Sequence, residues 1–175
     1  MSVNRKSKNK GRIRIDLMAK GDRGNPLCRF CFTETDGKLK TFCSSQCLHE
    51  HKLRSDSSYL RKCVERRDRG VCNHCKFDTK VLMAKAIDLV KKKKRWTWGG
   101  LKKELDVLFA KYRYPLLPET RPANLKRLAR FVYRTGIYWH ADHILAVKNG
   151  GGECSLKNMQ TLCVPCHKDK TRVEC

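Results

Sequence analysis

Three stretches in the middle of the chain carry apolar residues at intervals of three or four, the spacing that gathers side chains on one face of a helix. Their apolar members are Met83, Ile87 and Val90; Leu101, Leu105, Leu108 and Tyr112; and Leu125, Leu128 and Val132. Glycines at 99 and 100 and prolines at 115, 118 and 122 separate the stretches. The pattern therefore predicts a mostly helical region up to residue 135.

The segments on either side of this region have patterns of their own. Residues 55–69 begin with serine and aspartate, which can cap a helix, and continue with Leu60, Cys63 and Val64, so a helix is expected there. After Gly136 the pattern becomes β-like: 137–144 predicts one strand, a glycine-rich loop follows, and 156–162 predicts a second strand. A helix is expected from Pro165 onward, because proline suits a first turn. The expected fold class is α+β.

Four of the eleven cysteines lie close together near the start of the chain. They are Cys28, Cys31, Cys43 and Cys47, in a C-x2-C-x11-C-x3-C pattern. Two close pairs joined by a short loop can wrap one tetrahedral zinc ion, with a turn expected at Asp36 and Gly37. His49 or His51 could replace one thiolate. The other interpretation is four ordinary buried cysteines, but paired spacing is typical of zinc ligands.

Two further C-x2-C pairs stand far apart in the sequence. Cys72 and Cys75 form the first, and Cys163 and Cys166 form the second. A lone pair of this kind can be a redox centre. Two pairs in a chain that already has a zinc pattern are expected to share one ion, which would link the helix at 55–69 to the C-terminal segment. The odd cysteine count and the basic N-terminus without an apolar export segment also favour thiolates over disulfides.

The charge is strongly unbalanced. Forty lysines and arginines against seventeen acids give a formal net charge of +23. An excess of this size repels itself in a folded protein, so a polyanionic partner is expected. Hydrophobic residues make up 40% of the chain, enough for a modest core, and no run approaches the length of a membrane span. The expectation is a nucleic-acid-binding protein with no membrane partner, in the nucleus of a eukaryotic cell or otherwise in the cytoplasm.

Two basic segments are candidates for contact with that partner. Residues 1–24 are predicted to be a flexible arm, either a solubilising tail or a nuclear-import or phosphate-contacting segment. The densest run lies at 91–95 and includes Lys92, Lys93 and Arg95, with Trp96 and Trp98 beside it. The aromatic neighbours favour a nucleic-acid contact. A solvated face with tryptophans in the core is the other interpretation.

Near the C-terminus, Asp142, His143, Asn158 and His167 are residue types suited to phosphodiester cleavage. A carboxylate and an imidazole can hold a hard divalent cation, and a histidine can take a proton from attacking water. Asp142 and His143 are consecutive, so a regular strand would send them to opposite faces and a bend or bulge is expected. His140 should share the face of Asp142, as an accessory phosphate contact or as a partly exposed strand residue. Asn158 suits side-chain to backbone hydrogen bonds that pin the glycine-rich loop.

These residues, in the string from Asp142 to Thr171 with Cys163 and Cys166, resemble the HNH (ββα-metal) endonuclease family, and the knuckle at 66–72 is similar to the family's zinc-binding version. Residues 42–64 resemble something narrower, the zinc-finger-plus-HNH module of annealing helicases that work at stalled forks. The resemblance implies a catalytic Mg²⁺ or Mn²⁺ held by Asp142 and His167. It also implies His143 as general base and Asn158 as the residue that orients its loop.

The resemblance has departures as well. Ala146 stands where the family often has proline, and Thr171 stands where a third metal-side residue is sometimes found. Three cations of the last helix, Lys168, Lys170 and Arg172, are expected to contact the nucleic-acid backbone, with a plain surface role as the alternative. Cys154 and Cys175 are assigned no role.

The resulting expectation is a chain of four parts: the arm at 1–24, a four-cysteine zinc finger at 25–54, a helical region with the first knuckle at 55–135, and an HNH core at 136–175. Its function would be metal-dependent DNA cleavage, acting on particular DNA structures at replication forks or in repair. The cofactors would be two structural Zn²⁺ and one Mg²⁺ or Mn²⁺, and the partners would be DNA and other domains of a larger repair or replication protein. The alternative is a zinc-stabilised DNA-binding module without cleavage activity.

Overall fold

The computed structural model describes residues 15–36, 40–92, 95–122, 128–152 and 155–174, and it divides into two compact units, 1–56 and 57–175. Helices and one small sheet are mixed in the chain, so the fold is α+β as predicted. Within the described residues, no helix has both the length and the apolar content needed to cross a membrane.

The described part of the first unit contains a short 3-10 helix (Ile15–Leu17), several turns and the helix α1 (Ser45–Ser55). Ser44 caps this helix, because its hydroxyl accepts a hydrogen bond from the backbone N–H of Cys47 at 3.1 Å. Sequence patterning did not predict α1. Leu53 is the buried residue of this helix, so the helix has no series of apolar positions. In the segment expected to be an arm, residues 1–14 lie outside the described part, and Ala19 accepts a backbone hydrogen bond from Leu27. The turn predicted at 36–37 also falls partly outside the described residues.

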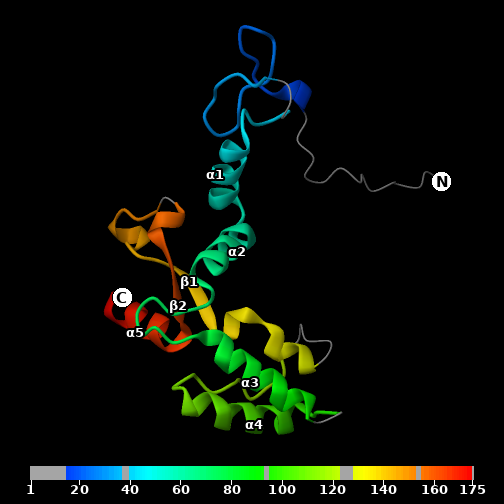
Figure 1. Cartoon of the computed structure of the whole chain (residues 1–175), viewed down its shortest axis with the longest axis vertical. Helices are drawn as coiled ribbons and strands as arrows, with labels where there is room; N and C mark the ends of the chain where they lie inside the picture. Colours follow the sequence, from blue (N-terminus) through cyan, green and yellow to red (C-terminus); the bar gives the residue numbers. More distant parts are fainter. Residues whose placement is uncertain (1–14, 37–39, 93–94, 123–127, 153–154, 175) are drawn as a thin grey trace, which may run out of the picture. The chain divides into compact units, whose positions relative to one another are not determined.

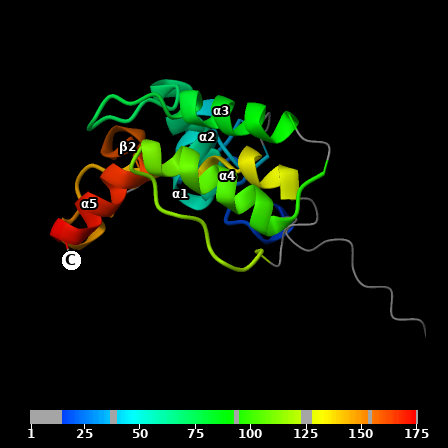
Figure 2. The same cartoon turned by 90° about the horizontal axis from the view of Figure 1, so that it is seen from below.

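The second unit opens with three α-helices: α2 (Ser57–Asp68), α3 (Thr79–Lys91) and α4 (Trp98–Lys111). All three were predicted, but of the predicted apolar face of α3 only Val90 is buried. Leu82, Ala86 and Val90 are buried there, whereas Met83 and Ile87 are only half-buried. The two views of the structure show α3 and α4 side by side (Figures 1 and 2).

The third predicted helix of this region differs from the expectation. Residue 125 lies outside the described part, and Leu128–Tyr133 form a 3-10 helix. Both tryptophans of the basic run donate hydrogen bonds inside the fold. The indole of Trp96 donates to Val90 O, and the indole of Trp98 donates to Glu119 O, so these rings serve the helical packing. This supports the interpretation of the tryptophans as structural.

The sheet is an antiparallel hairpin of β1 (Trp139–His143) and β2 (Met159–Cys163), followed directly by α5 (Val164–Glu174). The hairpin and α5 appear in yellow to red in Figure 1. Both strands are shorter than predicted. Residues 137 and 138 precede β1, because Thr135–Ile137 is a 3-10 helix and the carbonyl of Tyr138 accepts the Tyr114 hydroxyl at 2.6 Å. Likewise, Leu156–Asn158 is a 3-10 turn before β2.

The two faces of the hairpin have different neighbours. Cross-strand pairs share a face, so His140 and Asp142 lie with their partners Leu162 and Gln160, while Trp139 lies on the other face. The guanidinium of Arg61 on α2 stacks over Trp139, with its carbon 3.8 Å from the ring centroid. Side chains of α5 contact the first face. Helices α2 and α5 therefore cover opposite faces, and Asp142 belongs to the α5 side.

Candidate metal centres and nuclease site

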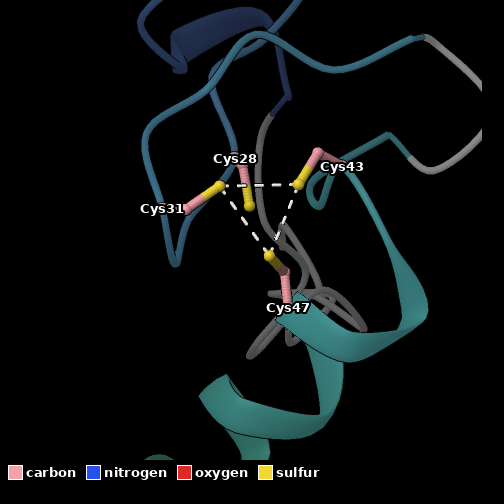
Figure 3. A group of neighbouring side chains, drawn as sticks. All are labelled: Cys28, Cys31, Cys43 and Cys47. Carbon is pink, nitrogen blue, oxygen red and sulfur yellow. Dashed lines mark hydrogen bonds between the residues drawn. The ribbon is translucent and has the colours of Figure 1, made fainter.

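The first unit brings its four predicted zinc ligands together. Cys28, Cys31, Cys43 and Cys47 lie with all sulfur atoms within 4.8 Å of one another (Figure 3). The Sγ atom of Cys43 is 3.4 Å from that of Cys31 and 3.4 Å from that of Cys47. A tetrahedral zinc ion with bonds of ~2.3 Å separates its sulfur ligands by ~3.8 Å, so the cluster can hold zinc. All four ligands are cysteines, and neither His49 nor His51 belongs to the cluster.

The second unit contains the other predicted cluster. Cys72, Cys75, Cys163 and Cys166 also lie within 4.8 Å of one another, although the two pairs are distant in sequence. The Sγ atoms of Cys75 and Cys163 are 3.7 Å apart, again close to the separation in a zinc tetrahedron. An ion here would join the knuckle after α2 to the junction of β2 and α5.

The two knuckles have the same backbone geometry. Phe32 and Lys76 each follow the second cysteine of a pair, and both adopt a left-handed conformation with φ of 61° and 60°. In each knuckle that residue's N–H donates to the carbonyl of the first cysteine at 2.9 Å. The side chain and backbone of Thr33 lower the pKa of Cys31 to about 6, whereas hydrogen bonds with Cys47 and Cys31 raise the pKa of Cys43 to about 12, so the thiolate form is favoured at Cys31. The same turn therefore brings together the two cysteines of each pair as potential metal ligands.

Asp142 and His167 face each other between β1 and α5. The Asp142 Oδ1 atom lies 3.8 Å from the His167 Nε2 atom, and the carboxylate side chain is 16% exposed. Two bonds of ~2.1 Å would span up to ~4.2 Å, so one divalent ion fits between these atoms. The His140 ring packs on His167 with centroids 4.5 Å apart, and burial lowers the pKa of His140, which keeps that ring neutral. His140 therefore supports His167 from the side.

The second oxygen of Asp142 is already in use. Its Oδ2 atom accepts hydrogen bonds from Lys170 Nζ at 2.5 Å and from Gln160 Nε2 at 3.1 Å. Lys170 also donates to the carbonyl of His143. Oδ2 is thus held by protein donors, and Oδ1 is left facing His167. Thr171 turns its hydroxyl to the carbonyl of His167 at 2.9 Å, so it is not arranged as a third ligand.

Asn158 clamps the loop after β1, as the sequence predicts. Its side chain accepts from the N–H of Leu145 at 2.8 Å and donates to the carbonyls of Leu145 at 3.1 Å and Gly151 at 2.9 Å. The backbone carbonyl of Asn158 accepts from Ile144 at 2.7 Å. Gly151 is indispensable here, since an added Cβ would lie 1.8 Å from the oxygen of Leu145. This glycine was not among the predicted site residues, although it belongs to a run of three.

The bulge expected between Asp142 and His143 is absent from β1. The register runs without interruption from Trp139 opposite Cys163 to His143 opposite Met159. The chain changes direction only at 144–145, immediately after the strand ends. By strand alternation, His143 starts from the face opposite to Asp142. Its action on the same phosphate stays a prediction.

The predicted nucleic-acid contacts are scattered. Lys168 and Arg172 are exposed on α5, while Lys170 is turned onto Asp142. In the other basic run, Lys92 and Arg95 are exposed and Lys93 lies outside the described residues.

Two arginines of α2 also support the site, and sequence reasoning did not find them. Arg67 donates to the carbonyls of Leu156 at 2.6 Å and Met159 at 2.7 Å, on either side of Asn158. Arg61 donates to the carbonyl of Trp139 at 2.8 Å. Arginine-rich helices usually indicate a solvated or nucleic-acid-binding face, so the sequence carried no signal for these inward contacts.

A hairpin followed by a helix, with Asp142 and His167 paired across it and Asn158 closing the loop, is the arrangement of a ββα-metal site. Residues 131–172 match the family model described as HNH endonuclease. The chain belongs to the HNH endonuclease family.

The similar proteins are larger molecules. The chain is 33% identical over 166 residues to the "DNA annealing helicase and endonuclease ZRANB3" of Homo sapiens, and 34% identical over 164 residues to that of Mus musculus. Each match covers 89% of this chain and 14% of the relative, so the chain spans about 14% of the length of the curated relatives it matches. The crystal structure of the human ZRANB3 HNH domain is 34% identical, with 67% of this chain and 88% of that chain covered and a TM-score of 0.43.

Proposed function

We propose that this chain is a metal-dependent DNA endonuclease that hydrolyses phosphodiester bonds. The observation that supports it most directly is the pairing of Asp142 Oδ1 with His167 Nε2 at 3.8 Å, in a chain of the HNH endonuclease family. Lys170 and Gln160 hold the other carboxylate oxygen, so Asp142 would bind the ion through Oδ1 alone. Mg²⁺ or Mn²⁺ held there would neutralise a non-bridging phosphate oxygen and stabilise the leaving 3′ oxygen.

The chain's own residues divide the remaining work. His143 stands at the end of β1, and its imidazole takes a proton from the attacking water, a role for which histidine is the side chain most often used. Asn158 fixes the backbone that follows His143, so the base has a defined position. Lys168 and Arg172 on α5 contact phosphates of the DNA backbone, as do Lys92 and Arg95 on the helical region.

The similar proteins suggest a substrate and a cellular context for this chain. The matched relatives are described as DNA annealing helicases and endonucleases, and they are several times longer than this chain. We propose that this chain is the nuclease part of a larger DNA-processing protein that acts on branched DNA at forks or in repair, in the nucleus. The parts at 25–54, 55–135 and 136–175 would then be its zinc finger, helical region and HNH core.

A second candidate function is a zinc-stabilised DNA-binding module without cleavage. It is favoured by Lys170, whose ammonium group already contacts both Asp142 and the carbonyl of His143. A cation built into the chain at this place reduces the negative charge available to a divalent ion. Thr171 supplies no third ligand to offset that loss.

One experiment separates the two functions. Labelled duplex and forked DNA are incubated with the parent chain, His143→Ala and Lys170→Met, each with Mg²⁺ or Mn²⁺ added. The nuclease predicts metal-dependent nicking by the parent and none by His143→Ala, with DNA affinity unchanged within about threefold in both. Binding that weakens with salt but never leads to cleavage, in the parent with either metal, would favour the binding module. Cleavage that first appears in Lys170→Met would identify the lysine as the reason.

A further inference from the structure

The segment directly after His143 exposes large apolar side chains. Ile144 is 52% exposed, Leu145 is 50% exposed and Val147 is 60% exposed. Single exposed apolar residues are ordinary on a protein surface, but three of them within four positions form a patch that calls for a partner. We name Ile144, Leu145 and Val147 the apolar tip.

The apolar tip stands on a fixed backbone. Leu145 N–H and carbonyl are both bonded to Asn158, and Gly151 closes the loop by donating to the carbonyl of Ala146 at 3.0 Å. The backbone of Gly151 lies so close to Leu145 that a Cβ added at position 151 would clash with the Leu145 carbonyl. Both backbone polar groups of Leu145 are thus hydrogen-bonded while its side chain is half exposed. Because the loop is already ordered, its insertion into a binding partner would lose little conformational entropy.

The surroundings of the apolar tip indicate which partner fits. The loop 144–158 contains two lysines, Lys148 and Lys157, both exposed, against one acid, Glu153, so it carries a net positive charge. The tip also begins one residue after His143, where the phosphodiester chemistry is proposed. A partner with negative charge at its rim and apolar flat surfaces inside it matches this arrangement, and duplex DNA has both.

We propose that the apolar tip is a wedge that enters the minor groove of duplex DNA and unstacks a base step beside the phosphate presented to His143. Apolar side chains inserted between base steps in this way kink the duplex and widen the contact with the protein. The inference rests on the proposed nuclease function and narrows its substrate to DNA that is unstacked, or easily unstacked, at the cutting position. Forks, bulges and flexible pyrimidine–purine steps belong to that class.

The test uses the double variant Leu145→Ser/Val147→Ser, because serine removes the apolar surface and keeps the backbone groups that Asn158 binds. Val107→Ser is the matched control, since Val107 is 70% exposed on α4. Two DNAs are compared, an intact duplex and the same sequence with a two-base bulge at the centre. Each carries 2-aminopurine near the centre, whose fluorescence rises on unstacking. Binding is measured with Ca²⁺ in place of Mg²⁺ and cleavage with Mg²⁺.

The parent should raise the fluorescence of the intact duplex, and the double variant should not. Loss of two apolar contacts should weaken the variant's binding to the intact duplex by about tenfold. Its binding to the bulged DNA, where the unstacking is already present, should change by less than about threefold. The Val107→Ser variant should match the parent in both assays.

Equal weakening on both DNAs would overturn the wedge, as would a parent that binds without any rise in fluorescence. A double variant identical to the parent would also overturn it and would assign the apolar tip to a protein partner. The two proposals fail separately. Unstacking without cleavage by the parent would refute the nuclease and keep the wedge, whereas cleavage without unstacking would do the reverse.

Discussion

Replacement of Asn158 tests how the loop beside His143 is held. Asn158→Ala removes three side-chain hydrogen bonds, to Leu145 N, Leu145 O and Gly151 O. Each contributes ~0.5–1.5 kcal/mol net, and water can replace part of them in this half-buried place, so a loss of about 2 kcal/mol is expected. Asn158→Asp should lose more stability, about 3 kcal/mol. A carboxylate can still accept from Leu145 N, but its second oxygen would face the carbonyl oxygens of Leu145 and Gly151 and be repelled by them.

The order of the two variants is the informative result. The three tryptophans stand at positions 96, 98 and 139, all in the second unit, so their fluorescence during urea unfolding reports on that unit. Asn73→Ala is the control, since its side chain makes an exposed hydrogen bond to Gln160, and it should change stability by less than about 0.5 kcal/mol. An aspartate variant as stable as the alanine variant would show that the two carbonyl contacts do not hold the loop.

Cys163→Ser should reduce bound zinc from two ions per chain to one, measured by atomic absorption, and the second unit should unfold at a lower urea concentration. Cys63→Ser is the control, because Cys63 lies outside both clusters and its replacement should leave both ions bound. Unchanged zinc content in Cys163→Ser would contradict the second site. Partial burial acts to raise the pKa of Asp68, but hydrogen bonds from Arg67 and Thr161 outweigh it and hold the pKa below its ordinary value. A lowered folded-state pKa stabilises the protein above the unfolded pKa of ~3.9 and loses that effect as pH falls through the folded value, so Asp68→Asn should cost about 1–2 kcal/mol at pH 7 and progressively less below pH ~4. A difference between parent and Asp68→Asn that does not shrink on acidification would exclude this origin.

Local spacing was enough to predict the zinc clusters and the order of strands and helix. A metal ion requires four ligand atoms at one point, so cysteine pairs carry their own long-range information. Strand ends were harder, because they depend on tertiary contacts. The Tyr114 hydroxyl donates a hydrogen bond to the carbonyl of Tyr138 just before β1, and no local sequence pattern predicts this contact. The face of α3 was misjudged for a similar reason: Ala86, a small residue outside the apolar series, is buried and Ile87 is not.

The candidate site divides in the same way. Asn158 could be assigned its loop contacts from residue type and position, and the structure confirms those hydrogen bonds. The role of Gln160 at Asp142 required the cross-strand register, which sequence alone does not give. Lys170 is three residues after His167, a spacing that puts both on one helix face, so helical periodicity was a usable signal for it.

The second zinc cluster and the loop after β1 are connected by a chain of short contacts. An ion in the cluster would fix the knuckle that follows α2 against the end of β2. Arg67 and Asp68 at the end of α2 then hold the backbone on both sides of Asn158 and the N–H of Thr161. Asn158 in turn holds the loop. Because each link is a hydrogen bond of 2.6–3.1 Å to backbone, movement of α2 would shift the loop with it. Thiolate-bound zinc exchanges far less readily than a divalent ion held by one carboxylate and one imidazole. A zinc ion in the second cluster would therefore set the geometry at which the proposed divalent ion at Asp142 acts.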